Sequence, residues 1–133
     1  MKVMLDTNIC IALINQKSAK VLAQLKQYKV GEVCISAVTL AELQYGVAKS
    51  KHQHKNADAL QQFILPLEVA AFDESATNAY GELRAYLEMQ GTPIGALDMM
   101  IAAHALSLNV KLVTNNTKEF KRVLGLNLLD WLN

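Results

Sequence analysis

Short apolar runs alternate with segments of helical periodicity along almost the whole chain. Five runs have the length and composition of strands, at residues 2–5, 33–35, 69–72, 111–114 and 126–129. Between them, apolar side chains recur with the spacing of helices over residues 9–15, 18–28, 40–47, 57–65, 73–90 and 96–108. Because a parallel neighbour needs a crossover connection, this alternation favours an α/β sandwich with a mainly parallel sheet.

Local signals mark where some of these elements begin and end. Ser36 and Thr39 are both candidate N-caps for the third predicted helix. Asn109 stands where the last long helix can end. The polar, basic residues 49–55 are expected to form a helix end or a loop, and polar residues 115–117 follow the fourth strand.

Composition places the chain among folded single domains. It has no linker, repeat or low-complexity tract, so we expect one domain over residues 1–133. Apolar residues make up 52% and charged residues 19%, which excludes disorder. The longest stretch without Asp, Glu, Lys or Arg is much shorter than the roughly 20 residues of a membrane span, so we expect a soluble, cytoplasmic protein. Cys10 and Cys34 lie in apolar runs and are expected to be small buried side chains.

Three acids each stand alone among uncharged residues: Asp6 within residues 3–16, Glu42 within 33–48 and Asp98 within 89–110. Burying an ionised carboxylate costs several kcal/mol unless a charge, hydrogen bonds or a metal compensates. Taken singly, Asp6 fits a helix cap, and Glu42 and Asp98 fit solvated helix faces. Three such acids together favour a shared site.

The predicted sheet gives these acids a place to meet. Sites in open α/β sheets form beyond the carboxyl ends of the strands, and Asp6 directly follows the first strand. Asn116 follows the strand at residues 111–114, and helices carrying Glu42 and Asp98 can reach the same crevice. Clustered carboxylates need cations, and oxygen ligands favour Mg²⁺ or Mn²⁺. Such a centre can activate water against a phosphodiester, which indicates a nuclease.

Four motifs occur in order: MLDTN (residues 4–8), SAVTLAELQYGVAKS (36–50), PIGALDMMIAAHAL (93–106) and LVTNNTKEF (112–120). Together they resemble the PIN-domain toxins of the VapC type over essentially the whole chain. The resemblance implies a three-layer α/β/α sandwich and a Mg²⁺- or Mn²⁺-dependent endoribonuclease. It implies the toxin of a type II toxin–antitoxin pair, which inhibits translation by cutting RNA, with a tRNA anticodon loop as the expected target. It also implies a homodimer, a VapB-type antitoxin lying across a groove, and DNA contact only through that antitoxin.

The resemblance also assigns roles to residues. Asp6, Glu42 and Asp98 match the three catalytic acids: Asp6 and Asp98 are expected to ligate the ion, and Glu42 to ligate it or to orient the attacking water. Many PIN domains have a further acid after the late strand, where this chain has Asn116. Asn116 offers a carbonyl oxygen and Glu119 offers the missing charge, so both are candidate metal ligands. The expected products carry a 5′-phosphate and a 3′-hydroxyl.

Several polar residues keep two interpretations. Thr7, Asn8 and Thr114 either hydrogen-bond the acids or serve only as caps and turn residues. The basic group Lys49, Lys51, His52, His54 and Lys55 either grips RNA phosphates or forms a solvated helix end.

A second basic patch consists of Lys118, Lys121 and Arg122. Arg84 lies in the long helix, where it can face the substrate or a partner. His104 lies in an apolar helix and is expected to be a satisfied core histidine rather than a general base.

Three rival classes fit less well. A receiver-like signalling domain requires paired acids after the first strand and a lysine after a late one, and the chain has neither. A dinucleotide-binding domain requires a glycine-rich phosphate loop, which is missing from the sequence. A catalytically inert, partner-binding PIN-like domain has no need of three isolated acids.

Overall fold

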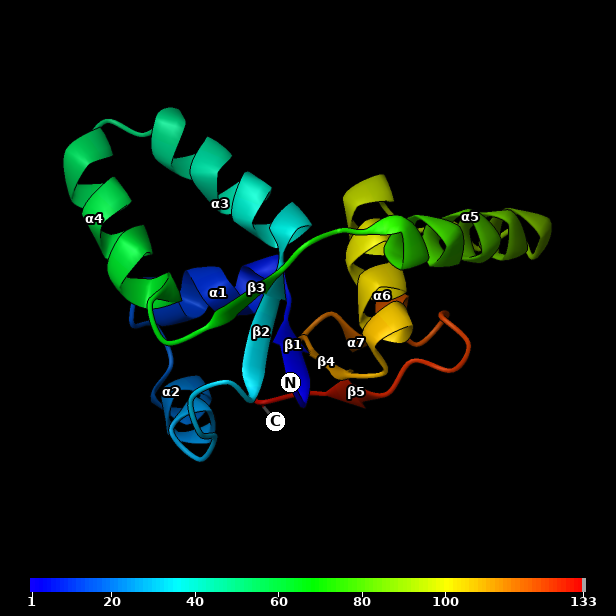
Figure 1. Cartoon of the computed structure of the whole chain (residues 1–133), viewed down its shortest axis with the longest axis horizontal. Coiled ribbons are helices and arrows are strands. Elements are labelled where there is room, and N and C mark those ends of the chain that lie inside the picture. Colours follow the sequence, from blue (N-terminus) through cyan, green and yellow to red (C-terminus); the bar gives the residue numbers. More distant parts are fainter. Residues whose placement is uncertain (133) are drawn as a thin grey trace.

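The computed structural model describes residues 1–132, in which five short strands form one sheet (Figure 1). The strands are β1 (Val3–Leu5), β2 (Val33–Ser36), β3 (Glu68–Ala70), β4 (Lys111–Val113) and β5 (Leu128–Leu129). Their order is β3-β2-β1-β4-β5, and all four pairings are parallel. The predicted parallel α/β sheet is therefore confirmed, with the first strand at its centre. Residue 133, the end of the predicted domain, lies outside the described residues.

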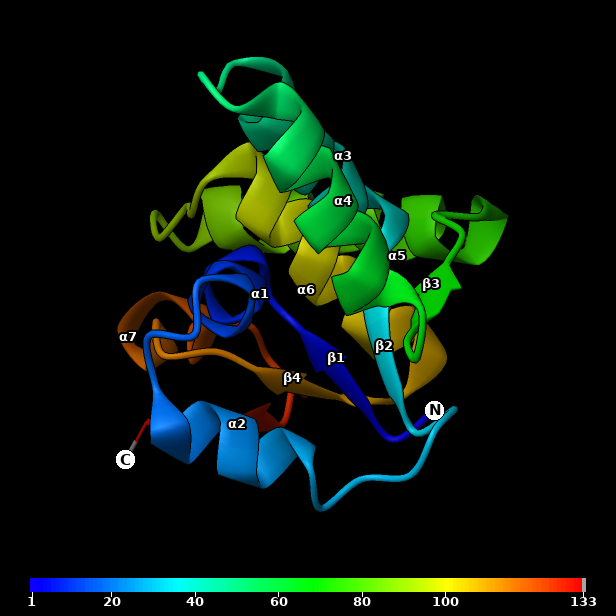
Figure 2. The same cartoon turned by 90° about the vertical axis from the view of Figure 1, so that its left-hand side faces the viewer.

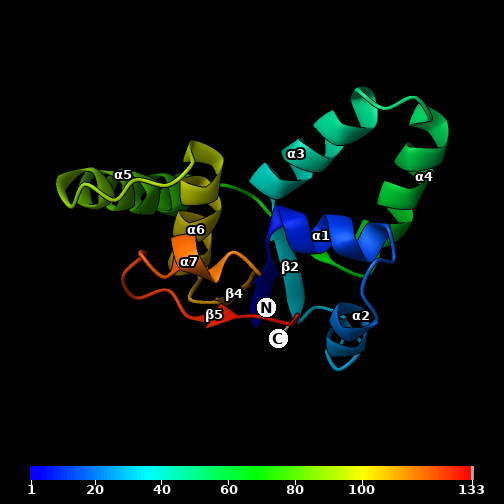
Figure 3. The ribbon, with the colours of Figure 1, turned by 180° about the vertical axis from the view of Figure 1, so that it is seen from behind.

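Helices cover both faces of the sheet. They are α1 (Thr7–Ile14), α2 (Ala19–Leu25), α3 (Ala37–Ala48), α4 (Gln53–Ile64), α5 (Glu74–Met89), α6 (Ala96–Leu108) and the single turn α7 (Thr117–Phe120). Figures 1 and 3 show α1 to α4 on one side and α5 and α6 on the other. Val3 and Leu5 point into the first of these cores and Met4 into the second, because side chains alternate along a strand. The result is the three-layer sandwich that the resemblance implies.

Side-chain caps start the helices that leave the sheet. Asp6 accepts a hydrogen bond from the N–H of Ile9 at the start of α1. Ser36 accepts one from the N–H of Val38, so Ser36 rather than Thr39 caps α3. Asn109 ends α6 in the left-handed conformation, with φ of 54°. The carboxyl ends of β1 and β2 thus run directly into α1 and α3, with α6 nearby (Figure 2).

Most helix boundaries differ from the prediction by a few residues, and the differences at α4, α7 and α2 have a visible reason. α4 begins at Gln53 rather than at residue 57, because its first turn is exposed and polar and shows no apolar spacing. α7 was not predicted, since one turn is too short to show a period. α2 ends at Leu25, and Tyr28 beyond it stacks on Trp131 with ring centroids 5.7 Å apart.

The buried cysteines agree with the sequence. Cys10 and Cys34 are both free thiols in the core. Burial raises the pKa of the Cys10 thiol well above its ordinary value, so it stays protonated. Among residues 1–132, no helix has the length and apolar character needed to cross a bilayer.

Candidate active site

Asp6 lies where β1 ends and α1 begins, and it is only 4% exposed. Its backbone N–H donates to the carbonyl of Val113 at 3.0 Å, and its carboxylate accepts from the N–H of Ile9 at 2.9 Å. Burial raises the pKa of Asp6. Hydrogen bonds from Thr114 and Ile9 oppose that rise, and the charge of Glu42 adds to it. The fold therefore fixes this carboxylate in a partly dehydrated position.

Glu42 reaches the same place from α3, the helix that follows β2. The hydroxyl of Thr7 donates to Oε1 of Glu42 at 2.6 Å and lies 3.3 Å from the hydroxyl of Thr39. Because Thr7 is the residue after Asp6, this bond holds Glu42 beside the start of α1. The sequence left open whether Thr7 bonds an acid or only caps a helix, and the structure shows the bond.

Asp98 lies in the first turn of α6, on the other helical layer. Burial and then the charges of Glu119, Asp6 and Glu42 raise the pKa of Asp98 to about 6. Three carboxylates from separate segments thus act on a fourth. Asp98 therefore lies within electrostatic reach of Glu119, Asp6 and Glu42, and Asp6 within reach of Glu42.

Asn116 and Glu119 form a bonded pair at the carboxyl end of β4. The side-chain amide of Asn116 donates to Oε2 of Glu119 at 3.0 Å, and its backbone N–H donates to the hydroxyl of Thr114 at 3.0 Å. Asn116, an amide where the resemblance led us to expect an acid, therefore hydrogen-bonds the carboxylate of Glu119. Their predicted role as metal ligands stays a prediction.

The negative charge of this cluster has no cationic partner within the described chain. The ion pairs there are Lys2–Glu32 and Arg84–Glu88, both on the surface. Within residues 1–132, no three His, Cys, Asp or Glu side chains already lie close enough to enclose a metal ion. The donors are carboxylate, amide and hydroxyl oxygens, a set that suits Mg²⁺ or Mn²⁺. A divalent cation bound there would offset the repulsion among these carboxylates, which adds to the effect of burial on the pKa of Asp98.

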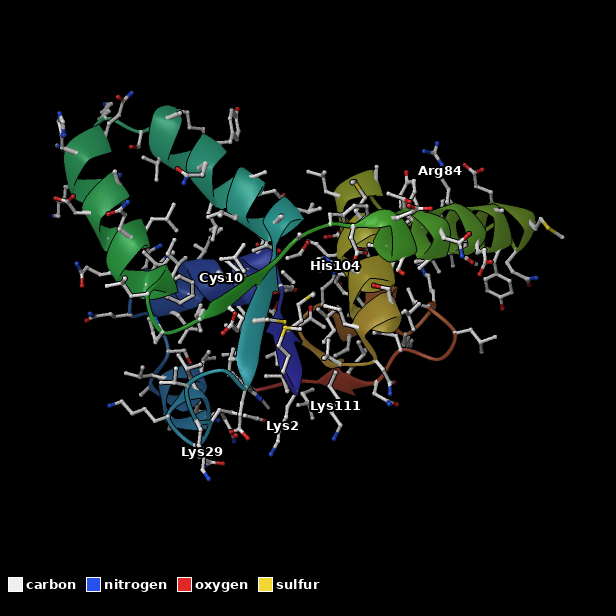
Figure 4. The ribbon with its side chains drawn as sticks, in the orientation of Figure 1. Lys2, Cys10, Lys29, Arg84, His104 and Lys111 are labelled. Carbon is white, nitrogen blue, oxygen red and sulfur yellow. The ribbon has the colours of Figure 1, made fainter. Side chains whose placement is uncertain are left out.

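A buried hydrogen bond joins the two helices that carry Glu42 and Asp98. Nδ1 of His104, on α6, lies 2.7 Å from the hydroxyl of Ser36, which also caps α3. Figure 4 shows His104 beside α6, under the segment between β3 and α5. Burial lowers the pKa of His104, although Asp73 and the Ala71 backbone oppose this, so the ring is neutral.

The expectation of a core histidine is correct for the burial of His104, and the bond to Ser36 satisfies one of its two ring nitrogens. Nε2 of His104 has no hydrogen-bond partner among the described residues. The rings of Phe72 and His104 pack in a T-shaped arrangement, with centroids 5.2 Å apart. Sequence reasoning missed the link to Ser36, for which the only signal was a polar ring in an apolar helix.

Arg84, Arg122 and the basic group of residues 49–55 lie on the surface. Arg84 points outward from α5, where it bonds Tyr80 and Glu88 of its own helix (Figure 4). Arg122, after α7, donates to the carbonyl of Pro93 at 3.1 Å. The basic group of residues 49–55 spans the connection from α3 to α4 and is largely exposed.

A groove adjoins the acids on the α1–α4 side. It has a volume of about 250 Å³ and lies between α1, α3 and α4. Ile11, Ile14, Val47 and Leu60 give it an apolar lining, and Glu42 stands at its edge. A ligand in this groove would lie against one of the four acids.

Comparison with known proteins identifies the family. The model of the PIN domain matches residues 3–126. The chain belongs to the PIN domain family. This PIN domain is 45% identical over 131 residues, 98% of each chain, to the tRNA(fMet)-specific endonuclease VapC of Shigella flexneri. The predicted VapC-type resemblance is confirmed.

Solved structures of relatives have the same fold as this PIN domain. Crystal structures of VapBC2 from Rickettsia felis bound to a promoter DNA fragment and of DNA-bound VapBC from Salmonella typhimurium contain chains that superimpose with TM-scores of 0.93 and 0.94. Sequence identities are 45% and 41%. The alignments cover 98% of this chain in both cases, and 99% and 98% of the other chains.

Proposed function

We propose that residues 1–133 form a single PIN domain that hydrolyses RNA phosphodiester bonds with the help of Mg²⁺ or Mn²⁺. The observation that carries the proposal is that Glu119, Asp6 and Glu42 lie within electrostatic reach of half-buried Asp98, whose pKa is raised to about 6 by burial and then by these charges, with no ion pair to the cluster in the described chain. Similarity to an endonuclease over nearly the full length supports the same reaction.

Each side chain has a defined part in this reaction. Asp6 and Asp98 would hold the ion, and Asn116 and Glu119 are further candidate ligands at the end of β4. The bound ion supplies a more acidic water and neutralises charge on the phosphate. Glu42, held by the Thr7 hydroxyl, orients the attacking water. Hydrolysis leaves a 5′-phosphate and a 3′-hydroxyl.

The substrate we propose is tRNA, cut in the anticodon loop. The Shigella flexneri relative is named for its action on tRNA(fMet), and this relative shares 45% of the aligned residues. Cleavage of an initiator tRNA would stop translation at its first step. The chain would then act in the cytoplasm as the toxin of a type II toxin–antitoxin pair.

The partner we propose is a VapB-type antitoxin seated in the groove between α1, α3 and α4. Its apolar lining suits the tail of such a partner, and Glu42 at its edge explains how binding would inhibit the toxin. The similar VapBC structures were determined with DNA, which supports DNA contact through the antitoxin. We also expect the toxin to be a homodimer.

Cleavage of a purified initiator tRNA, titrated with Mg²⁺ and Mn²⁺, tests the proposed activity. Asp6→Ala and Asp98→Ala should each abolish metal-dependent cleavage, because each removes an ion-holding carboxylate. Asp58→Ala removes an exposed carboxylate from α4 and is the matched control, which should cleave like the parent. Full activity in either site variant would contradict the proposal, and an inert RNA-binding domain would show no cleavage in any form.

A further inference from the structure

One side of α3 carries an acid and an aromatic ring, and a cation follows at its end. Glu42 and Tyr45 stand at positions i and i+3 of this helix, and Lys49, its C-cap, follows at i+7 in helical conformation. At 100° and about 1.5 Å per residue, Lys49 lies within about 20° of Glu42 around the axis and about 10 Å further along it. Tyr45 lies between them, about 4.5 Å along the axis from Glu42. We call Tyr45 and Lys49 the α3 stripe.

The α3 stripe is exposed and does not contribute to the lining of the apolar groove. Tyr45 is 66% exposed, and Nζ of Lys49 lies 5.0 Å from the centroid of its ring. The groove is lined on α3 by Glu42, Leu43, Gly46 and Val47, which does not include the stripe. An exposed aromatic ring with a cation above it therefore begins one turn from the candidate active site.

Basic residues gather where α3 passes into α4. Residues 43–57 contain no Asp or Glu but contain Lys49, Lys51 and Lys55, together with His52 and His54. These basic residues lie at the end of α3, in its connection to α4 and in the first turn of α4. This end of the α3–α4 pair is the one furthest from the sheet (Figure 1). A bound polyanion that extends from the acid cluster along α3 therefore reaches this basic region.

A polyanion at the acid cluster needs nearby cations, because four carboxylates repel its phosphates. The net charge of the chain is only +1, so this help has to be local. Lys49 is a cation on the same helix face as Glu42. Unpaired bases stack on exposed aromatic rings, while lysines neutralise the adjacent phosphates.

We infer that the α3 stripe binds the single-stranded RNA next to the cleaved bond, with Tyr45 stacked on a base and Lys49 on a phosphate. This inference rests on the proposed function, whose substrate is RNA. It assigns contacts outside the acids, and it resolves the two interpretations of the basic group in favour of RNA contact for Lys49.

Binding of an RNA hairpin tests the role of Tyr45. The probe is a fluorescein-labelled hairpin with seven unpaired loop nucleotides, and all chains carry Asp98→Asn to prevent cleavage. Tyr45→Leu should raise the Kd about ten-fold, within the range for loss of one base stack, and Tyr45→Phe should stay within two-fold. Tyr86→Leu, on the exposed side of α5, is the matched control and should leave the Kd unchanged.

Salt dependence of the same binding tests the role of Lys49. Lys49→Ala should reduce the slope of log Kd against log salt by about 0.7, the value for one phosphate of a single strand. Lys49→Arg should restore the slope. Lys111→Ala, at the amino end of β4 and away from α3, should leave it unchanged (Figure 4).

The kinetics of the active chain separate this inference from the proposed function. With Asp98 intact, Tyr45→Leu should raise KM much more than it lowers kcat, because it removes binding rather than chemistry. If the parent cleaves RNA with metal but Tyr45→Leu leaves the Kd and KM unchanged and Lys49→Ala leaves the salt slope unchanged, the inference about the α3 stripe is wrong and the proposed function stands. If the parent shows no metal-dependent cleavage, both proposals are wrong. Thermal unfolding of each variant confirms that it is folded.

Discussion

Asp98 shows at the scale of one residue how the fold stores unfavourable charge. Its ordinary pKa of 3.8 rises to about 6 through burial and the charges of Glu119, Asp6 and Glu42. The folded chain therefore keeps this proton to a higher pH than the unfolded chain does. As the pH rises from about 4 to about 6, the unfolded chain ionises first, so the free energy of unfolding falls.

This sign leads to a test of pH and metal dependence. In EDTA, Asp98→Asn should unfold at a higher temperature than the parent at pH 7.5, by roughly 3–6 °C, and at the same temperature at pH 4. Mn²⁺ at pH 7.5 should raise the unfolding temperature of the parent and not that of Asp98→Asn. Differential scanning calorimetry measures both effects. A variant that is less stable than the parent at both pH values would refute the argument, and Asp58→Asn is the control.

Thr7 offers a second test at this scale. Thr7→Val keeps the shape of the side chain but removes the hydroxyl that donates to Glu42. A hydrogen bond to a charged group contributes about 1.5–3 kcal/mol, so its full use in catalysis corresponds to roughly 10–100-fold in rate. We expect Thr7→Val to slow RNA cleavage within that range, measured under single-turnover conditions.

Thr77→Val is the control for this experiment, since its hydroxyl bonds only the Glu74 carbonyl on exposed α5. Equal rates for Thr7→Val and the parent would show that the bond to Glu42 has no part in catalysis.

At the scale of elements, the bond between Ser36 and His104 connects the start of α3 to the middle of α6. His104→Leu should lower the free energy of unfolding by about 1–3 kcal/mol, because it leaves a buried hydroxyl with one partner fewer. Adding Ser36→Ala should then cost less than it does in the parent, since the two side chains share one interaction. Urea unfolding of the parent, the two single variants and the double variant completes this double-mutant cycle. Additive losses would mean that the two residues stabilise the chain independently.

The sequence could predict the elements whose signal is local. The strand at residues 111–114 and the helix at residues 96–108 have continuous apolar runs, and their observed bounds differ by at most one residue. α7 and the first turn of α4 lack such runs, so the sequence carries no local apolar signal for them.

The acids of the candidate site could be named because each lacks charged neighbours in the sequence. The hydrogen-bond partners around the site could not be predicted in this way. Ser36 and His104 are 68 residues apart, and Thr7 and Glu42 are 35 apart. Nothing local in the chain specifies which polar groups meet once the helices pack.

At the scale of the whole molecule, one sheet separates two cores, and the acids come from both sides of it. Glu42 lies on α3, which packs mainly with the α1–α4 core, and Asp98 lies on α6 in the opposite core. Loosening either core therefore disturbs the distances among the acids.

Unfolding experiments can test this shared dependence. Leu87→Ala in α5 and Leu60→Ala in α4 each remove a buried side chain, and each should cost about 2–5 kcal/mol. The chain contains one tryptophan, the buried Trp131, so its fluorescence reports on the fold. In both variants, RNA cleavage and fluorescence should be lost at the same urea concentration. Cleavage that survives the fluorescence transition would show that one layer is sufficient.

The central position of β1 has a consequence for the synthesis of the chain. β1 leaves the ribosome first, but β4, which covers its second edge, is among the last elements to be made. Asp6 therefore cannot come close to Asp98 and Thr114 until most of the polypeptide has emerged from the ribosome. Because the proposed cleavage requires both Asp6 and Asp98, the nascent chain would stay inactive until α6 and β4 have been made and packed.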